Sequence, residues 1–378
     1  MPNQLQQLAS VGQSIWLDNI RRSMFASGEL HKLIANGLRG MTSNPTIFEK
    51  AIDSGNDYDE QLKSLVGKVS DPQMLFEEFA IDDIRHALDE FRPLYDETNG
   101  GDGFVSLEVS PLLANDTKGT IEMAQRLWKD VNRPNLMIKI PGTKAGGPAI
   151  SASIEAGLNV NVTLLFSLAS YDMAANAYIE GLERRVAAGK PVDRIASVAS
   201  FFLSRIDTKV DKELEAKISA GDASLSNLLG KAAVANAKLA YEDFEKIFGS
   251  ERFAKLKAKG AKVQRPLWAS TSTKNPNYYD LMYVETLVGP HTVNTIPPNT
   301  YDALLDHGKV SADTVKSDVA GAHKVFDDLK RAGISMDRIT EELTVDGVAQ
   351  FEESYNKMLE AIGEKQKALA ASLTSARK

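Results

Sequence analysis

Short runs of apolar residues recur along the whole chain, and each is long enough for one β-strand. We predict strands over residues 14–18, 40–44, 104–109, 136–140, 160–166, 196–203, 266–271 and 292–296. Between them, apolar residues recur at three- and four-residue spacing, which predicts helices over residues 71–90, 120–129, 169–188 and 225–248. The same spacing predicts further helices over residues 313–331 and 348–372. The chain therefore alternates strands with helices and ends in a helical segment.

This alternation predicts the fold class. Strands separated by helices are typical of a parallel sheet. The fold is therefore expected to be of the α/β class. None of the eight predicted strands has the exposed polar pattern of an edge strand, which favours a closed (β/α)8 TIM barrel over an open doubly wound sheet. We expect one domain over residues 1–378, in which residues 300–378 form a mainly helical C-terminal extension packed on the barrel.

Nearly every predicted strand carries a polar residue near its C-terminal end. These residues are Asp18, Asn44, Glu108, Lys139, Thr163, Ser200, Ser270 and Asn294. The active sites of (β/α)8 enzymes lie at the C-terminal ends of the strands. Because acidic and basic side chains have no structural use in a core strand, these positions indicate a functional rim.

Lys139 lies in the apolar segment Leu136–Ile140, where strand alternation places it on one face with Met137. Lysines are rarely buried without a purpose, since an unpaired ammonium group is costly in an apolar environment. Burial favours the neutral amine, which attacks a ketone to form a Schiff base. Alternatively, the side chain reaches solvent at the strand end or pairs with a carboxylate.

Glu108 and Asp18 lie at the ends of two other predicted strands. Two carboxyl groups near one lysine allow a division of acid–base work. One would carry protons during Schiff-base formation, and the other would take a hydroxyl proton during C–C cleavage. The alternative is that either carboxylate is simply an ion-pair partner of Lys139. Asn44 and Thr163 would add neutral hydrogen-bonding groups, and Pro45 would hold Asn44 in an extended conformation.

Arg205 and Lys274 each follow a predicted strand by a few residues, and the hydroxyl groups of Ser200 and Ser270 lie nearby in the sequence. Rim loops of (β/α)8 enzymes often bind phosphate, and arginine presents two parallel donors to phosphate oxygens. We therefore predict a phosphate-binding end of the site. The alternative for each cation is a solvated position on the surface.

Composition narrows the possible functions. The chain has no cysteine, which excludes thiol catalysis and cysteine-based zinc sites, and its five histidines lack metal-ligand spacing, so we expect no metal and no other cofactor. A net charge of −7 argues against nucleic acid as a partner. No signal sequence or run of 18 apolar residues is present, so we expect no membrane association and a cytoplasmic location. Both a monomer and a homodimer are compatible with the sequence.

Three segments resemble the transaldolase family, and the resemblance extends over essentially the whole chain. Gly40–Phe48 (GMTSNPTIF) matches the N-terminal signature of the family, and Leu136–Thr143 (LMIKIPGT) matches the signature around its Schiff-base lysine. Asn159–Ser167 is similar to a third characteristic block. Arg265–Thr271 and Asn294–Pro298 resemble the longer bacterial branch. The resemblance implies a class I aldolase-like barrel with additional C-terminal helices.

The resemblance also implies roles for individual residues. Lys139 would be the nucleophile, Glu108 would act through a water on the carbinolamine, and Asp18 would take the C4 hydroxyl proton. The remaining residues would position the substrate hydroxyls, the water and the phosphate: Asn44, Asn161, Thr163, Ser200, Arg205, Ser270 and Lys274.

The implied reaction belongs to the non-oxidative pentose phosphate pathway and has sugar phosphates as its partners. A dihydroxyacetone unit passes from sedoheptulose 7-phosphate to glyceraldehyde 3-phosphate and gives erythrose 4-phosphate and fructose 6-phosphate. Two departures from the family pattern are present. Lys274 stands where members often have arginine, and the context Trp16–Asn19 differs from the Asp-Thr-Gly run of shorter members.

Two other functions remain open from the sequence. The first is a simple Schiff-base aldolase that releases the three-carbon unit to solvent, against which Glu108 argues because small aldolase relatives carry a tyrosine there. The second is a non-catalytic barrel that serves as a binding module.

Overall fold

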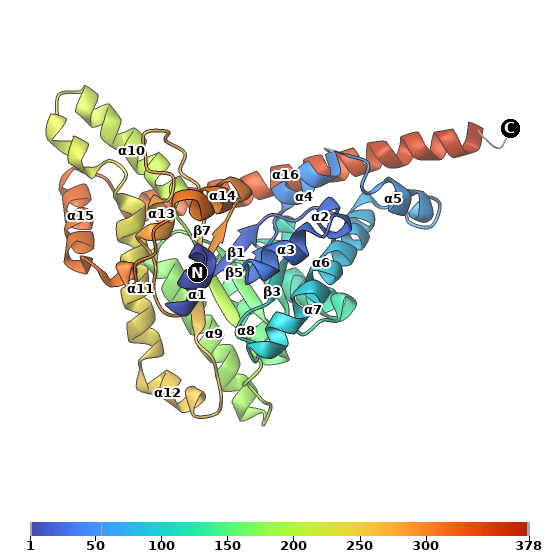
Figure 1. Cartoon of the computed structure of the whole chain (residues 1–378), viewed down its shortest axis with the longest axis horizontal. Helices are drawn as coiled ribbons and strands as arrows, with labels where there is room; N and C mark the ends of the chain where they lie inside the picture. Colours follow the sequence, from blue (N-terminus) through green and yellow to red (C-terminus); the bar gives the residue numbers. More distant parts are fainter. Residues whose placement is uncertain (1, 54, 376–378) are drawn as a thin grey trace.

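The computed structural model describes residues 2–53 and 55–375. Its eight parallel strands form a closed barrel in sequence order, which confirms the predicted (β/α)8 fold (Figure 1). The strands are β1 (Gln13–Asp18), β2 (Gly40–Thr42), β3 (Phe104–Glu108), β4 (Leu136–Pro141), β5 (Val160–Leu165), β6 (Ser197–Phe202), β7 (Gln264–Ala269) and β8 (Thr292–Ile296). Because β1 pairs with both β2 and β8, the described sheet has no free edge.

Helices surround the barrel, and those from α2 to α13 connect consecutive strands (Figure 1). From the N-terminus they are α1 (Gln4–Ser10), α2 (Ser23–Ala26), α3 (Glu29–Ala35), α4 (Pro45–Asp53), α5 (Asp59–Leu65), α6 (Pro72–Glu97), α7 (Thr117–Val131), α8 (Gly146–Ala156), α9 (Leu168–Ala187), α10 (Ser204–Ser219), α11 (Ala232–Phe248) and α12 (Glu251–Lys257). The later ones are α13 (Met282–Glu285), α14 (Pro298–His307), α15 (Val319–Arg331) and α16 (Met336–Ser375). Short 3-10 turns, η1 (Pro111–Leu113), η2 (Ala223–Leu228) and η3 (Thr314–Lys316), complete the set.

Helix boundaries follow local capping chemistry. Asp71 caps α6 by accepting a hydrogen bond from the backbone N–H of Gln73, and Pro72 occupies the first helical position, where a missing N–H costs nothing. The predicted helix over residues 225–248 is wrong in its first part. The chain forms the 3-10 turn η2 there, and Gly230 has a φ of +68°, so α11 begins only at Ala232.

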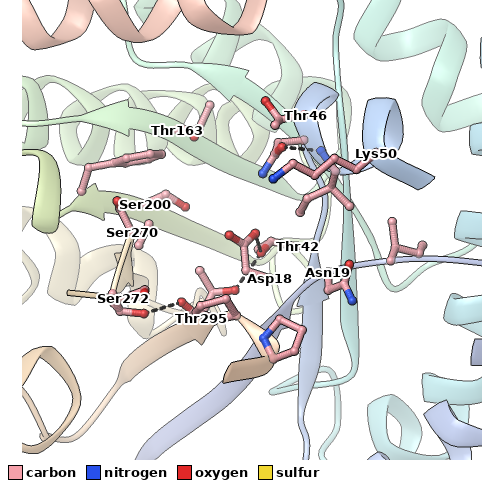
Figure 2. A pocket seen from close by; sticks show the side chains of 18 of the residues that line it. Asp18, Asn19, Thr42, Thr46, Lys50, Thr163, Ser200, Ser270, Ser272 and Thr295 are labelled. Carbon is pink, nitrogen blue, oxygen red and sulfur yellow. Dashed lines mark hydrogen bonds between the residues drawn. The ribbon is translucent and has the colours of Figure 1, made fainter. Parts of the chain in front are cut away.

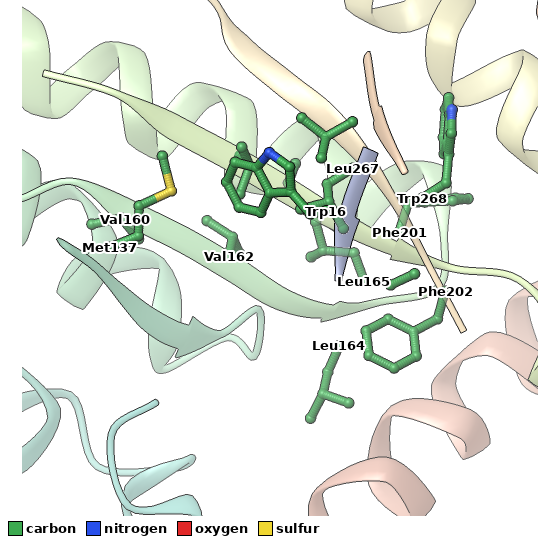
Figure 3. Close-up of a cluster of buried hydrophobic side chains, with 14 of the residues drawn as sticks. Trp16, Met137, Val160, Val162, Leu164, Leu165, Phe201, Phe202, Leu267 and Trp268 are labelled. Carbon is green, nitrogen blue, oxygen red and sulfur yellow. The ribbon is translucent and has the colours of Figure 1, made fainter. Parts of the chain in front are cut away.

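The inside of the barrel is filled by side chains from alternate strand positions. Trp16 of β1 is fully buried at its centre, and Figure 3 shows its indole ring together with Met137 of β4 and Leu267 of β7. Gly40 of the neighbouring strand β2 makes room for this ring, since a Cβ atom there would lie 2.6 Å from the indole. Any other residue at position 40 would therefore displace Trp16 or β2.

Helix α16 runs across the molecule at the C-terminal side of the barrel (Figure 1). It packs against α4 and α6, and Thr46 of α4 donates a hydrogen bond to Ser354 of α16 at 2.9 Å. Phe351, Tyr355 and Met358 are buried at helical spacing along one face. The helix begins at Met336, whereas the sequence predicted a start at residue 348. No helix in the described parts of the chain is long and apolar enough to cross a membrane.

Candidate active site

A cavity of about 480 Å3 opens at the C-terminal ends of the strands (Figure 2). All but two of the predicted site residues line it: Asp18, Asn44, Lys139, Thr163, Ser200, Arg205, Ser270 and Lys274. Glu108 and Asn161 lie directly behind this wall, where each contacts a lining residue. The closed barrel therefore brings together side chains that are more than 250 positions apart in the sequence, from Asp18 to Lys274.

Lys139 projects into the barrel, and its side chain is 5% exposed. Its Nζ atom lies 3.2 Å from Oε2 of Glu108 and donates a hydrogen bond to the backbone carbonyl of Ser43 at 3.0 Å. The ring of Phe351 from α16 lies 5.7 Å from the same nitrogen. The lysine thus does not extend into solvent, as one alternative supposed, and its amine is held beneath an aromatic ring.

Glu108 is the partner of Lys139 because β3 and β4 pair in the register that places these two residues side by side. Its side chain is 4% exposed, and Oε1 has no hydrogen-bond partner in the described structure. Burial raises the pKa of the Glu108 carboxyl, and the charge of Lys139 opposes this effect. A carboxyl group of this kind can hold and release a proton close to the lysine amine.

Asp18 lies at the end of β1 and accepts a hydrogen bond from Oγ1 of Thr42 at 2.7 Å (Figure 2). Oγ1 of Thr42 also lies 2.7 Å from the hydroxyl oxygen of Thr295, and this second hydrogen bond fixes the position of Thr42. Burial raises the pKa of the Asp18 carboxyl, whereas Lys139, the Thr42 hydrogen bond and Arg205 lower it. The two carboxyl groups therefore have different partners, which is how one site obtains two distinct proton carriers.

Asn161 does not face the cavity. Its amide group donates to Ser106 at 3.0 Å and accepts from Ser200 at 2.7 Å, so it holds the hydroxyl of Ser200 at the cavity wall. Thr163 lines the cavity, and its buried Oγ1 has no hydrogen-bond partner in the described part of the chain. A polar ligand would supply that partner.

The side chains of Asn44 and Ser270 each make a hydrogen bond within the protein. Asn44 follows the end of β2, and its side-chain oxygen accepts the N–H of Ile47, which caps α4. Ser270 adopts a φ of +56°, unusual for a residue with a Cβ atom, and its hydroxyl lies 2.8 Å from that of Ser204. Both side chains nevertheless line the cavity.

Arg205 is a half-buried cation of the cavity. Its guanidinium lies 5.4 Å from the ring of Phe202 and 5.9 Å from that of Phe351, and its buried Nη1 has no hydrogen-bond partner among the described residues. Lys274 is exposed at the mouth. An anion that enters the cavity could accept a hydrogen bond from Nη1 of Arg205 and pair with the charge of Lys274.

Sequence reasoning missed several residues of the cavity: Arg21, Thr42, Lys50, Phe202, Thr295 and Phe351. For Lys50 a signal existed, because it shares one face of α4 with Thr46, Ile47 and Ala51. No local signal distinguishes Phe351 from any other apolar residue of a long amphipathic helix.

Fold and cavity together define a (β/α)8 barrel protein that carries an amine and two carboxyl groups at the C-terminal ends of its strands, where the active sites of such barrels lie. The model of the transaldolase/fructose-6-phosphate aldolase family matches residues 15–362. Among similar proteins, "Transaldolase 2" of Nostoc sp. is 47% identical over 97% of this chain and 99% of its own length. The transaldolases of Mycolicibacterium smegmatis and Mycobacterium tuberculosis are 47% and 46% identical, each over 95% of this chain and 96% of its own.

The chain therefore belongs to the transaldolase/fructose-6-phosphate aldolase family, and within it to the transaldolases of the longer bacterial type. It is an enzyme, a transferase.

Proposed function

We propose that the protein transfers a dihydroxyacetone unit from a ketose phosphate, sedoheptulose 7-phosphate, to glyceraldehyde 3-phosphate through a Schiff base on Lys139. The products are erythrose 4-phosphate and fructose 6-phosphate, as in the non-oxidative pentose phosphate pathway. The observation that carries this proposal is the buried amine of Lys139, 3.2 Å from a glutamate and facing a polar cavity of about 480 Å3. The relatives named transaldolase support the same reaction.

Schiff-base formation begins when the neutral amine of Lys139 attacks the C2 carbonyl of the ketose phosphate. The resulting carbinolamine loses its hydroxyl group as water, and the nitrogen forms an iminium. Glu108, acting through a water molecule, supplies and recovers the protons of this step, for which its proximity to Nζ and its raised pKa suit it. No metal is required, because the iminium itself serves as the electrophile.

Asp18 acts in the cleavage step. It takes the proton of the C4 hydroxyl while the C3–C4 bond breaks, and the bonding electrons move to the iminium to give an enamine. Its raised pKa makes it a stronger base than an ordinary aspartate, and the Thr42 hydrogen bond fixes its orientation. Erythrose 4-phosphate leaves, the enamine carbon attacks the aldehyde of glyceraldehyde 3-phosphate, and hydrolysis releases fructose 6-phosphate.

Arg205, Lys274, Ser200 and Ser270 would hold the substrate phosphate, and Asn44 and Thr163 would order the sugar hydroxyls and the catalytic water. Asn161 would act from behind the cavity wall, through the hydrogen bond that it accepts from Ser200. The unpartnered donors of Arg205 and Thr163 support this division. Phe351 covers the lysine amine and would keep water from protonating the enamine before the acceptor arrives. Such protection favours group transfer over release of the three-carbon unit.

The test is chemical trapping. Fructose 6-phosphate and borohydride are added to the protein, and the reduced three-carbon adduct is sought by mass spectrometry on the peptide that contains Lys139. An unmodified Lys139 would overturn the proposal and favour a non-catalytic barrel. Turnover of fructose 6-phosphate that does not depend on an aldehyde acceptor would instead indicate a simple aldolase.

A further inference from the structure

A second cavity, of about 580 Å3, lies at the opposite end of the barrel, at the N-terminal ends of the strands. It includes Ser14 of β1, Phe104 of β3 and Arg265 of β7, each within the first two residues of its strand. It shares no lining residue with the cavity around Lys139. None of the residues proposed above for the transfer reaction contributes to it.

Positive side chains predominate in this N-terminal cavity. Arg39, Lys257, Lys262 and Arg265 line it, and Asp102 is the one acidic residue among its lining residues. This excess stands out in a chain whose net charge is −7. Burial lowers the pKa of His291 at the same cavity, and the charges of Arg265, Lys257 and Lys316 add to this effect.

Asp102 does not neutralise the whole cluster. Its carboxylate accepts hydrogen bonds from Arg39 at 2.6 Å, from Arg265 at 3.0 Å and from Ser14 at 2.8 Å. One negative charge thus balances one of two arginines. Lys262 donates to the carbonyls of Asn99 and Gly100, which are uncharged, and Lys257 is exposed in the last turn of α12. The cavity keeps a positive charge that its own residues do not balance.

The inner wall of the cavity is apolar. Trp16, Phe104, Met137 and Val198 form it, and Figure 3 shows Trp16 and Met137 in the surrounding core. Two lining residues also have a buried N–H group without a hydrogen-bond partner in the described structure: Nε1 of Trp16 and Nε of Arg265. Buried donors of this kind are rare in proteins, and an acceptor on a ligand would satisfy them.

We propose that the N-terminal cavity is a second binding site, which takes a small organic anion with an aromatic or apolar body. The anionic group lies among Arg39, Lys257 and Lys262, and the apolar body lies over the apolar inner wall that Trp16, Phe104 and Met137 form. The residues that line the cavity indicate both parts of this ligand. The positive side chains outnumber the acidic ones and would bind an anionic group, and the apolar wall would bind a non-polar body.

The probe for this site is 8-anilinonaphthalene-1-sulfonate, which combines a sulfonate with an aromatic body and becomes fluorescent in apolar surroundings. The uncharged probe N-phenyl-1-naphthylamine has the same rings without the sulfonate. We expect the wild-type protein to bind the sulfonate saturably with one molecule per chain, and more tightly than the uncharged probe. Added sodium chloride should weaken the binding, since part of it is electrostatic.

Two matched variants locate the probe. Lys257→Glu reverses the charge of an exposed lysine at the N-terminal cavity, and Lys274→Glu does the same at the C-terminal cavity. Lys257→Glu should raise the Kd of the sulfonate about tenfold without changing the melting temperature or the transferase rate. Lys274→Glu should leave the Kd unchanged.

Three outcomes would overturn the proposal: absence of saturable binding, equal affinity for the two probes, and a Kd that responds to Lys274→Glu but not to Lys257→Glu. A Lys257→Glu variant of altered melting temperature would be replaced by Lys262→Met, for which the same rise in Kd is expected. An unchanged Kd in Lys262→Met would likewise overturn the proposal.

Discussion

Each end of the barrel has a buried acidic residue next to a basic one, but the two acidic residues differ in how many hydrogen bonds they accept. At the N-terminal end, Asp102 receives three hydrogen bonds, from Arg39, Arg265 and Ser14. At the C-terminal end, Glu108 lies next to Lys139 alone, and its Oε1 has no partner in the described structure. A carboxylate that accepts several hydrogen bonds fixes the segments that supply the donors, whereas burial with few donors raises the pKa of a carboxyl group such as that of Glu108. The comparison teaches that the number of donors separates a structural carboxylate from one suited to catalysis.

The largest expected effect concerns the amine at the C-terminal end. Lys139→Ala should abolish transferase turnover, because without the amine no Schiff base forms. The measurement is the rate of fructose 6-phosphate formation from sedoheptulose 7-phosphate and glyceraldehyde 3-phosphate. Lys144→Ala, which removes an exposed lysine from the loop after β4, is the matched control and should keep the wild-type rate. A turnover in Lys139→Ala close to that of the control would refute the proposed mechanism.

The second-largest effect is expected from substitution of Glu108, the buried carboxyl with few hydrogen-bond donors. We expect Glu108→Gln to lower kcat by about 10^2 to 10^4-fold, the usual contribution of a positioned acid–base group. The amide is close to the carboxyl in shape, so the melting temperature should change little. Steady-state kinetics together with thermal unfolding would separate the two effects. A large fall in stability with an unchanged kcat would show that Glu108 is structural, and the contrast between the two ends would disappear.

The matching substitution at the N-terminal end should behave in the opposite way. Asp102→Asn leaves two arginines without their anion, and we expect it to lower the free energy of unfolding by about 3 kcal/mol, the scale for breaking a buried ion pair. The kcat of the folded variant should stay near that of the wild type, because Asp102 contacts none of the proposed catalytic groups. Denaturant unfolding gives the first quantity and kinetics in buffer the second. A kcat lowered as strongly as in Glu108→Gln would show that the two ends are coupled.

The smallest expected effect tests the hydrogen bond to the second carboxyl of the active site. Thr42→Val keeps the shape of the side chain but removes the donor that lowers the pKa of Asp18. The pKa of Asp18 should therefore rise further, and the acid limb of the kcat/KM profile should move to higher pH. We expect kcat itself to fall about tenfold, a loss of the order of one hydrogen bond to a charged group. An acid limb that stays in place would mean that Asp18 is not the base that this limb reports.

How far the sequence could predict the site is clearest at Lys139 and Asn161. Both lie within predicted strands, where the apolar neighbours singled out Lys139 and the family resemblance alone assigned Asn161 to the site. The structure separates the two residues: Lys139 faces the cavity, whereas Asn161 holds Ser200 from behind. Whether an inward side chain meets the cavity or another side chain depends on its height in the barrel, which closure of the sheet sets.

The order of the strands and helices and the polar residues at the strand ends could be predicted from the sequence alone, because each depends on a local pattern that is visible within one segment. The alternation of eight strands with helices then indicated the barrel. Only the tertiary structure decided that Glu108 is the neighbour of Lys139, that Phe351 of α16 covers the amine, and that a positive cavity opens at the other end. These features depend on strand register and helix docking, which join residues distant in the sequence, and no local pattern encodes such pairings.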